Sequence, residues 1–372
     1  MLYIHVPFCK QACSYCDFYF VTGFKYKAEY VQAVQNEIKL RKNEINEVLN
    51  SIYFGGGTPS RLSIAEIEQI LNVIHANFKV LDTTEITLEA NPDDLTHEYI
   101  KGLIVLGINR LSIGVQSFDD NELKFMHRTH TAQKAEYSVK LSQDTGIENI
   151  SIDLIYGSPL LTDSQWQKNI QTAIQLQIPH ISAYNLTIEP KTALYQKVQQ
   201  GILPPVDEQK SAIQFRMVVE ILEHAGFEHY EISNFALPNW YSRHNVGYWL
   251  HAPYLGIGPS AHSFDGNTRS WNVRDIYTYL SDLLKNKLSI EEKESLTLEQ
   301  KANEMLMLGL RTKWGANLNK IYQKTEIDFF KIKGTEIEQF LEQKLLNISN
   351  QVLYLTLEGK LLADYITQKL IV

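Results

Sequence analysis

The sequence predicts an α/β fold, a partial (β/α)6 barrel of the TIM type followed by a small, mostly helical C-terminal domain. Two observations predict it. Short β-rich runs recur in the first half of the chain, and the segments between them place apolar residues at the three- and four-residue steps of amphipathic helices. This alternation favours a parallel sheet, because each right-handed crossover returns the next strand beside the last. The six runs lie at 2–6, 51–56, 85–90, 110–115, 149–155 and 180–187.

The helical pattern is clearest at 25–45 and 63–78, and one more helix followed by a short strand is expected between 200 and 235. Residues 240–264 are rich in aromatic residues, His and Gly, which indicates a functional loop region. Beyond 290 the sequence becomes charged and helical, with a short strand and turn near 353–360. We therefore divide the chain into a barrel (1–235), a region that closes the barrel (236–290) and a C-terminal helical domain (291–372).

Composition narrows the class of protein. The 372 residues are 44% hydrophobic and 21% charged, as in a chain that is folded throughout. A net charge of −8 argues against a nucleic-acid partner, which would require clustered Lys and Arg. The first residues do not resemble a secretory signal and no apolar window is long enough to span a bilayer. We expect a cytoplasmic protein with no transmembrane segment.

The only three cysteines, Cys9, Cys13 and Cys16, fall on one short segment after the first predicted strand. Three thiolates this close together can bind three irons of a [4Fe–4S] cubane and leave the fourth iron open. A zinc site would need a fourth ligand, for which His5 is the only near candidate, and a disulfide is disfavoured in the cytosol. The spacing favours the cluster.

The CxxxCxxC pattern after a first strand, with Tyr15 before the last Cys, resembles the signature of the radical S-adenosylmethionine (SAM) superfamily. Residues 55–59, Gly-Gly-Gly-Thr-Pro, directly follow the second strand, where that superfamily has a GGE-type motif. Glycine lets a ligand approach the backbone closely, here the methionyl amino group of SAM. The resemblance implies that SAM binds at the open iron.

The same resemblance implies a set of SAM-binding residues at the ends of later strands. Side chains at the carboxyl ends of barrel strands converge on one site although they are far apart in sequence. Tyr3 would lie towards the cluster side. The set is Tyr3, Gly56, Gly57, Thr58, Glu89, Gln116, Arg128 and Asp153.

Within the superfamily the chain resembles the oxygen-independent coproporphyrinogen III oxidase-like family from Tyr3 to its C-terminal segment LTLEGKLLADYI. This family contains true oxidases (HemN) and haem chaperones of the HemW group. The oxidases have an additional Cys two residues after the third ligand, where this chain has Phe18, and an extension before the first strand, whereas Tyr3 stands at the start here. Both differences favour the chaperone group.

Residues 244–249, His-Asn-Val-Gly-Tyr-Trp, fit the HNxxYW motif associated with that group. A neutral imidazole is a good axial ligand for haem iron, and aromatic rings can cover a flat macrocycle. We predict that His244 binds haem b. The alternative is a histidine anchored by hydrogen bonds, with Tyr248 and Trp249 packed against the barrel. His251 and His262 are further candidates of lower weight.

The resemblance therefore implies a haem chaperone that binds a [4Fe–4S] cluster, SAM and haem, and delivers haem to acceptor apoproteins such as respiratory cytochromes. No catalytic residue is assigned. The alternative is a radical SAM oxidoreductase that decarboxylates a porphyrinogen in porphyrin biosynthesis, and a third class is a structural zinc or interaction protein. The resemblance also suggests a homodimer and peripheral association with the inner face of the membrane.

Overall fold

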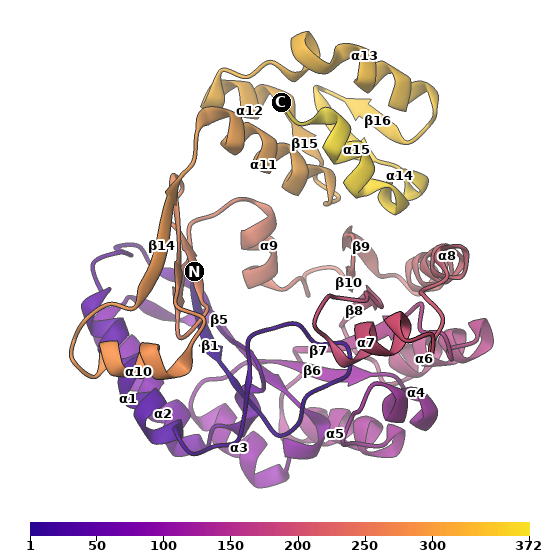
Figure 1. Cartoon of the computed structure of the whole chain (residues 1–372). Helices are drawn as coiled ribbons and strands as arrows, with labels where there is room; N and C mark the ends of the chain where they lie inside the picture. Colours follow the sequence, from indigo (N-terminus) through magenta and orange to yellow (C-terminus); the bar gives the residue numbers. More distant parts are fainter.

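A nine-stranded sheet forms the centre of the computed structural model, which describes all residues from 1 to 372 (Figure 1). The strand order is β11-β1-β4-β5-β6-β7-β8-β10-β9; β11 to β8 are parallel neighbours, and β10 and β9 continue the sheet in antiparallel pairing. The α/β class is confirmed, and the six predicted strands are β1 and β4 to β8. Their bounds are Leu2–Val6 (β1), Leu49–Gly56 (β4), Val80–Ala90 (β5), Arg110–Gln116 (β6), Ile150–Tyr156 (β7), His180–Asn185 (β8), Glu228–Glu231 (β9), Asn234–Ala236 (β10) and Leu255–Ile257 (β11).

Helices connect the parallel strands and cover the outer side of the sheet (Figure 1). Strand β7 illustrates the burial of these strands. All its side chains are buried except that of Asp153, as expected of a parallel strand covered on both faces. Two of the connecting helices begin with a capping box, Ser63 with Glu66 and Thr162 with Gln165. The helices are Lys27–Leu40 (α1), Ile64–Asn77 (α2), His97–Val105 (α3), Asp120–Phe125 (α4), Ala132–Thr145 (α5), Asp163–Gln175 (α6), Ala193–Gln199 (α7) and Glu208–His224 (α8), with 3-10 turns at Pro59–Arg61 and Pro92–Asp94.

The segment from 240 to 264 differs from the predicted loop region. Residues Arg243–Trp249 form helix α9, which carries the HNxxYW motif, and Leu255–Ile257 form the edge strand β11. The sequence pattern missed β11 because it has only three residues, one of them glycine, and its place depends on pairing with β1. The predicted loop region therefore contains a helix and two short strands, the second of which is His262–Phe264.

A buried ion pair fastens helix α1 to β11. Glu37 and Arg41 are 1% and 2% exposed, and their side chains meet at 3.1 Å. The Glu37 carboxylate also accepts hydrogen bonds from the Gly258 N–H and the Tyr279 hydroxyl. Arg41 donates to the Gly256 carbonyl at 2.9 Å. Charges this deep are stable only when they are paired and hydrogen-bonded, as they are here.

Two smaller sheets follow. The first, β12-β13-β14, adjoins β11, and the second, β15-β17-β16, belongs to the C-terminal part, which has its own core of 15 buried residues (Figure 1). The divisions predicted at 235/236 and 290/291 stay a prediction. The elements are His262–Phe264 (β12), Thr268–Asn272 (β13), Ile276–Leu283 (α10), Ile290–Ser295 (β14), Leu298–Leu310 (α11), Ala316–Asn317 (β15), Leu318–Thr325 (α12), Phe329–Glu342 (α13), Leu346–Ser349 (β16), Val352–Leu355 (β17), Leu357–Leu361 (α14) and Ala363–Leu370 (α15).

None of these helices combines the length and the apolar character that a bilayer-spanning helix requires.

Candidate functional site

The three cysteines lie on one loop that leaves the sheet after β1. Cys9 ends the short strand Phe8–Cys9 (β2), and the chain returns beside it as Val21–Thr22 (β3). All three thiols are partly exposed and none is in a disulfide. Burial raises the pKa of the Cys9 thiol, and that of Cys16 to about 11. Such thiols stay protonated at neutral pH until a metal ion or cluster displaces the proton.

Two donors face these sulfur atoms from other parts of the fold. The Thr58 hydroxyl donates to Cys9 Sγ at 3.5 Å, and Arg128 Nη1 donates to Cys13 Sγ at 3.4 Å. Donors of this kind stabilise thiolate ligands. Nowhere in the chain do three His, Cys, Asp or Glu side chains lie close enough together to hold a single metal ion. A cubane separates its thiolates over different irons, and the loop with its donors fits this group.

The turn at the end of β4 requires glycine, because a side chain would not fit there. Gly56 has φ of +112°, which an L side chain rarely adopts, and a Cβ there would lie 2.7 Å from the His5 ring. At Gly57 a Cβ would lie 2.8 Å from the Pro7 carbonyl carbon. Both glycines are therefore needed by the packing of the turn, and Gly56 also lines a pocket, which fits a backbone that SAM approaches closely.

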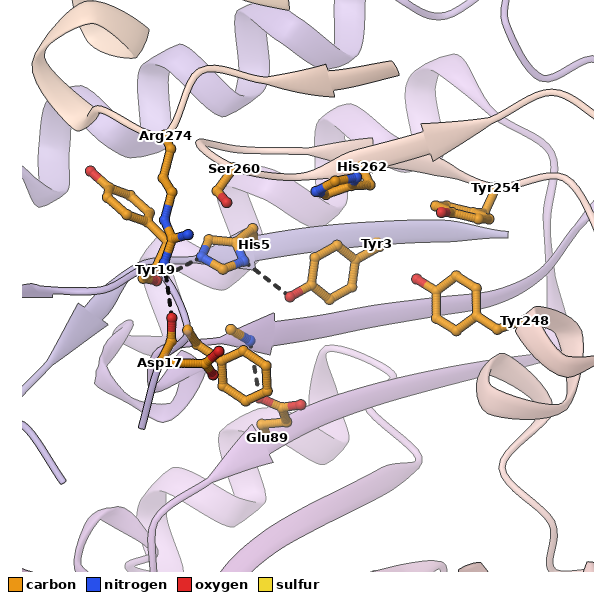
Figure 2. A pocket seen from close by; sticks show the side chains of 12 residues that line it. Tyr3, His5, Asp17, Tyr19, Glu89, Tyr248, Tyr254, Ser260, His262 and Arg274 are labelled. Atoms are coloured by element: carbon orange, nitrogen blue, oxygen red, sulfur yellow. Dashed lines mark hydrogen bonds between the residues drawn. The ribbon is translucent and has the colours of Figure 1, made fainter. Parts of the chain in front are cut away.

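Beside the cysteine loop the structure has a pocket of about 390 Å³, within the usual range of small-molecule sites (Figure 2). Its walls come from strands β1, β4 and β5, from the residues directly after the third cysteine, from helix α9 and from the segment between α9 and α10. Aromatic side chains dominate the lining. The residues are Tyr3, His5, Asp17, Phe18, Tyr19, Gly56, Glu89, Tyr248, Tyr254, Ser260, His262 and Arg274.

Glu89 is the acidic group of the inner wall, at the end of β5. One carboxylate oxygen accepts from the Tyr53 hydroxyl at 2.8 Å and the other from the Gly56 N–H at 3.1 Å. Burial raises the pKa of the Glu89 carboxyl to about 7; the bond from Tyr53 opposes this shift and the negative charge of Asp153 adds to it. A cationic group of a ligand would be attracted here.

This shift predicts a pH effect. Because folded Glu89 holds its proton up to about pH 7 and the unfolded residue only to about pH 4.5, stability falls as pH rises through that window. Without SAM, Glu89→Gln should stabilise the chain at pH 8 by on the order of 2 kcal/mol relative to its effect at pH 4.5. Urea midpoints between these pH values measure it. Glu98→Gln, on the exposed side of α3, should show no such trend, and an equal trend in both variants would contradict the prediction.

The other predicted SAM residues do not line the pocket, and two of them, Thr58 and Arg128, contact the cysteine sulfur atoms. Arg128 Nη2 donates to the Asn91 side-chain oxygen at 2.7 Å and to the Gly114 carbonyl at 2.8 Å. Gln116 ends β6 in a left-handed conformation with φ of 68°. Burial raises the pKa of Asp153 to about 6. The structure brings Tyr3, Gly56 and Glu89 into one wall; SAM binding by the full set stays a prediction.

His244, on helix α9, lies against strand β4 and is only 1% exposed. Its Nδ1 is 2.8 Å from the Ser51 hydroxyl and its Nε2 is 3.0 Å from the Tyr248 hydroxyl, while its ring stacks on Tyr53 at 5.0 Å. Burial lowers the pKa of the imidazole to about 3, so it is neutral. This arrangement matches the anchored histidine that the sequence left open. Haem ligation by His244 would first require one of these hydroxyl groups to leave its nitrogen.

Sequence reasoning missed several pocket residues. His5 Nδ1 is 3.1 Å from the Tyr3 hydroxyl, and His5 Nε2 is 3.0 Å from the Tyr19 carbonyl oxygen (Figure 2). The alternation of β1 could have revealed it, because residues 3 and 5 share a face. Arg274 donates to the Asp17 carbonyl at 2.8 Å from a loop without any motif, so no local signal pointed to it.

Comparison with known proteins shows which family the chain resembles. A model of the radical SAM superfamily matches residues 3–173, and a HemN C-terminal domain model matches residues 296–362. The chain is 36% identical to the haem chaperone HemW of Lactococcus lactis, covering 99% of this chain and 96% of that protein. It is 34% identical to HemW of Bacillus subtilis, with 97% and 96% covered.

A solved structure shares the fold. The coproporphyrinogen III oxidase HemN from Escherichia coli, described as a radical SAM enzyme, aligns with a TM-score of 0.86 at 21% identity, covering all of this chain and 89% of that one. Similarity along the full length, together with the cysteine loop and the glycine turn, leads to one assignment: this chain belongs to the HemW family of the radical SAM superfamily.

Proposed function

We propose that this protein is a haem chaperone, which binds haem over the exposed rim of the pocket beside the cysteine loop, leaves the inner wall of the pocket to SAM, and passes haem to acceptor haemoproteins such as respiratory cytochromes. The observation that carries the proposal is the pocket lining. Phe18, Tyr248 and Tyr254 offer apolar ring surface to a flat macrocycle, and Arg274 offers a cation to its propionates. Membership of the HemW family supports the same function.

The proposal includes two resident cofactors. Cys9, Cys13 and Cys16 would hold the [4Fe–4S] cluster, which supplies an open iron and an electron when it is bound. Its neighbours would bind SAM: the Gly56 turn lines the inner wall, and Glu89, held there by the Gly56 N–H, offers a carboxylate to the methionyl amino group. The complete proposed SAM set is Tyr3, Gly56, Gly57, Thr58, Glu89, Gln116, Arg128 and Asp153.

A titration with haemin tests the function. Anaerobically reconstituted protein should bind one haem per chain, seen as a saturating shift of the Soret absorption, and should lose it to an added apocytochrome. The porphyrinogen reaction provides the opposing test. Conversion of coproporphyrinogen III to protoporphyrinogen IX by the same preparation, under reducing anaerobic conditions with SAM, would replace the chaperone by the oxidase.

Cellular context is also part of the proposal. We infer a cytoplasmic protein that can associate with the inner face of the membrane and that forms a homodimer. Sedimentation of the purified chain, with and without haem, measures its association state. Flotation with lipid vesicles measures membrane binding.

A further inference from the structure

A second pocket lies at the edge of the large sheet opposite the cysteine loop. Its volume is about 440 Å³, which is within the usual range of small-molecule sites. It lies where β5, β6 and β7 begin, whereas the cysteine loop and the glycine turn follow the ends of β1 and β4. The two pockets share no residue. The lining of the second pocket is Thr83, Glu85, Asn109, Asn149, Pro238, Asn239, Trp240, Tyr241 and Arg243.

The charges of this lining balance, because Glu85 and Arg243 are its only charged residues. Glu85 is 4% exposed, and its two oxygens accept the backbone N–H groups of Arg243 and His244 at 3.1 and 3.2 Å. Arg243 is exposed and donates from Nη1 to the Thr83 carbonyl at 2.7 Å, which leaves Nε and Nη2 free for a carboxylate. Glu85 would repel a phosphate dianion, whereas a zwitterion matches a lining with one charge of each sign.

Asn149 is the unsatisfied polar residue of the lining. Its side-chain amide makes no hydrogen bond, and its Oδ1 is buried. The Asn109 amide, by contrast, donates to the Thr84 carbonyl and accepts from the Ile86 N–H. A buried amide oxygen without a partner is costly, and a half-turn about χ2 exchanges the two ends of the amide. The oxygen can therefore turn into the pocket and accept a hydrogen bond from an ammonium group.

Aromatic rings form another part of the lining. Tyr241 is held by the C-terminal part of the chain: Lys313 lies over its ring at 4.6 Å from the centroid, and the Trp314 ring meets it edge-on at a centroid distance of 6.1 Å. Trp240 is partly exposed, and Pro238 adds further apolar surface. A wall of this kind favours a ligand with an aromatic side chain.

We propose that the second pocket binds a free α-amino acid with an aromatic side chain. Its carboxylate pairs with Arg243, its ammonium group donates to Asn149 Oδ1, and its side chain packs against Trp240. The negative charge of Glu85 in the same wall also favours the ammonium group. This site goes beyond the proposed function, because it is a different pocket with a ligand other than haem or SAM. Arg243 is the first residue of α9, so the amino acid would also hold the start of that helix.

Isothermal titration calorimetry of the full-length protein with L-phenylalanine tests the proposal. The wild-type protein should bind one equivalent, and hydrocinnamate and phenethylamine, which each lack one of the two charges, should bind at least about tenfold more weakly. Arg243→Gln and Asn149→Leu should each weaken the binding of L-phenylalanine by about tenfold or more. The matched control is Arg216→Gln, which replaces an arginine of α8 outside the pocket.

Glu89→Gln distinguishes the second pocket from the SAM pocket, where an amino group is also expected to bind. If binding is lost in Glu89→Gln and kept in Arg243→Gln, the amino acid lies in the first pocket and the proposal fails. Equal binding of hydrocinnamate would overturn it, as would the absence of wild-type binding at about 10 mM L-phenylalanine. Asn149→Leu decides the matter if Arg243→Gln does not fold, because an amide without hydrogen bonds can be replaced with little effect on the thermal midpoint.

Discussion

Glu37→Ala should lower the free energy of unfolding by about 3 kcal/mol, because it leaves the buried Arg41 guanidinium with Glu44, a partly exposed residue, as its one carboxylate partner. The same change removes the acceptor of the Gly258 N–H, the Asn272 side-chain amide and the Tyr279 hydroxyl. The Gly258 N–H and the Tyr279 hydroxyl would stay buried without a partner, which adds to the cost, whereas the Asn272 amide keeps the Gly258 carbonyl. Urea denaturation followed by tryptophan fluorescence measures the change.

Glu44→Ala is the matched control, because Glu44 pairs with the same arginine but its side chain is 45% exposed. Exposed ion pairs contribute about 1 kcal/mol or less. A loss of less than about 1 kcal/mol in Glu37→Ala, equal to that of the control, would show that α1 and β11 are held together by apolar packing alone.

Cys13→Ala should abolish the iron–sulfur cluster, so that iron falls from about four per chain in anaerobically reconstituted wild-type protein to a trace. The remaining two thiols can hold at most two corners of a cubane, and no other thiol exists in the chain to replace the lost one. Iron and sulfide analysis, with the visible absorption of the cluster, measures the change.

Thr58→Val serves as its control. It removes the hydroxyl that donates to Cys9 Sγ but keeps all three ligands, so the cluster should form and become easier to lose on dilution. Stoichiometric zinc in wild-type protein, or a full complement of iron in Cys13→Ala, would contradict the assignment of the cysteine loop.

Most of the barrel could be predicted because its strands are buried on both faces. Strand β4, for example, is apolar at Ile52 and Phe54 and ends in glycine, and such runs stand out between amphipathic helices. The cluster-binding role of the cysteines could also be predicted from the sequence, because ligand chemistry depends on residue type and local spacing. The pocket position of Glu89 followed from its place at a strand end.

The burial of the two candidate haem ligands could not be predicted. His244 and His262 both lie in an aromatic, glycine-containing sequence, and only the fold shows that the first faces the Ser51 and Tyr248 hydroxyls while the second lines the pocket. A motif gives residue types, whereas ligand access depends on contacts between segments distant in sequence. Strand β11 was missed for the same reason, because it forms by pairing with β1, which is distant in sequence.

The pairing of β1 with β11 affects how the protein must fold during synthesis. Leu2 lies beside Leu255, so strand β1 receives its second neighbour only after the residues between the two strands have left the ribosome. Contacts this distant form slowly, and an unpaired apolar edge invites association with other nascent chains. We expect fragments that stop before residue 255 to aggregate, although they contain the complete cysteine loop.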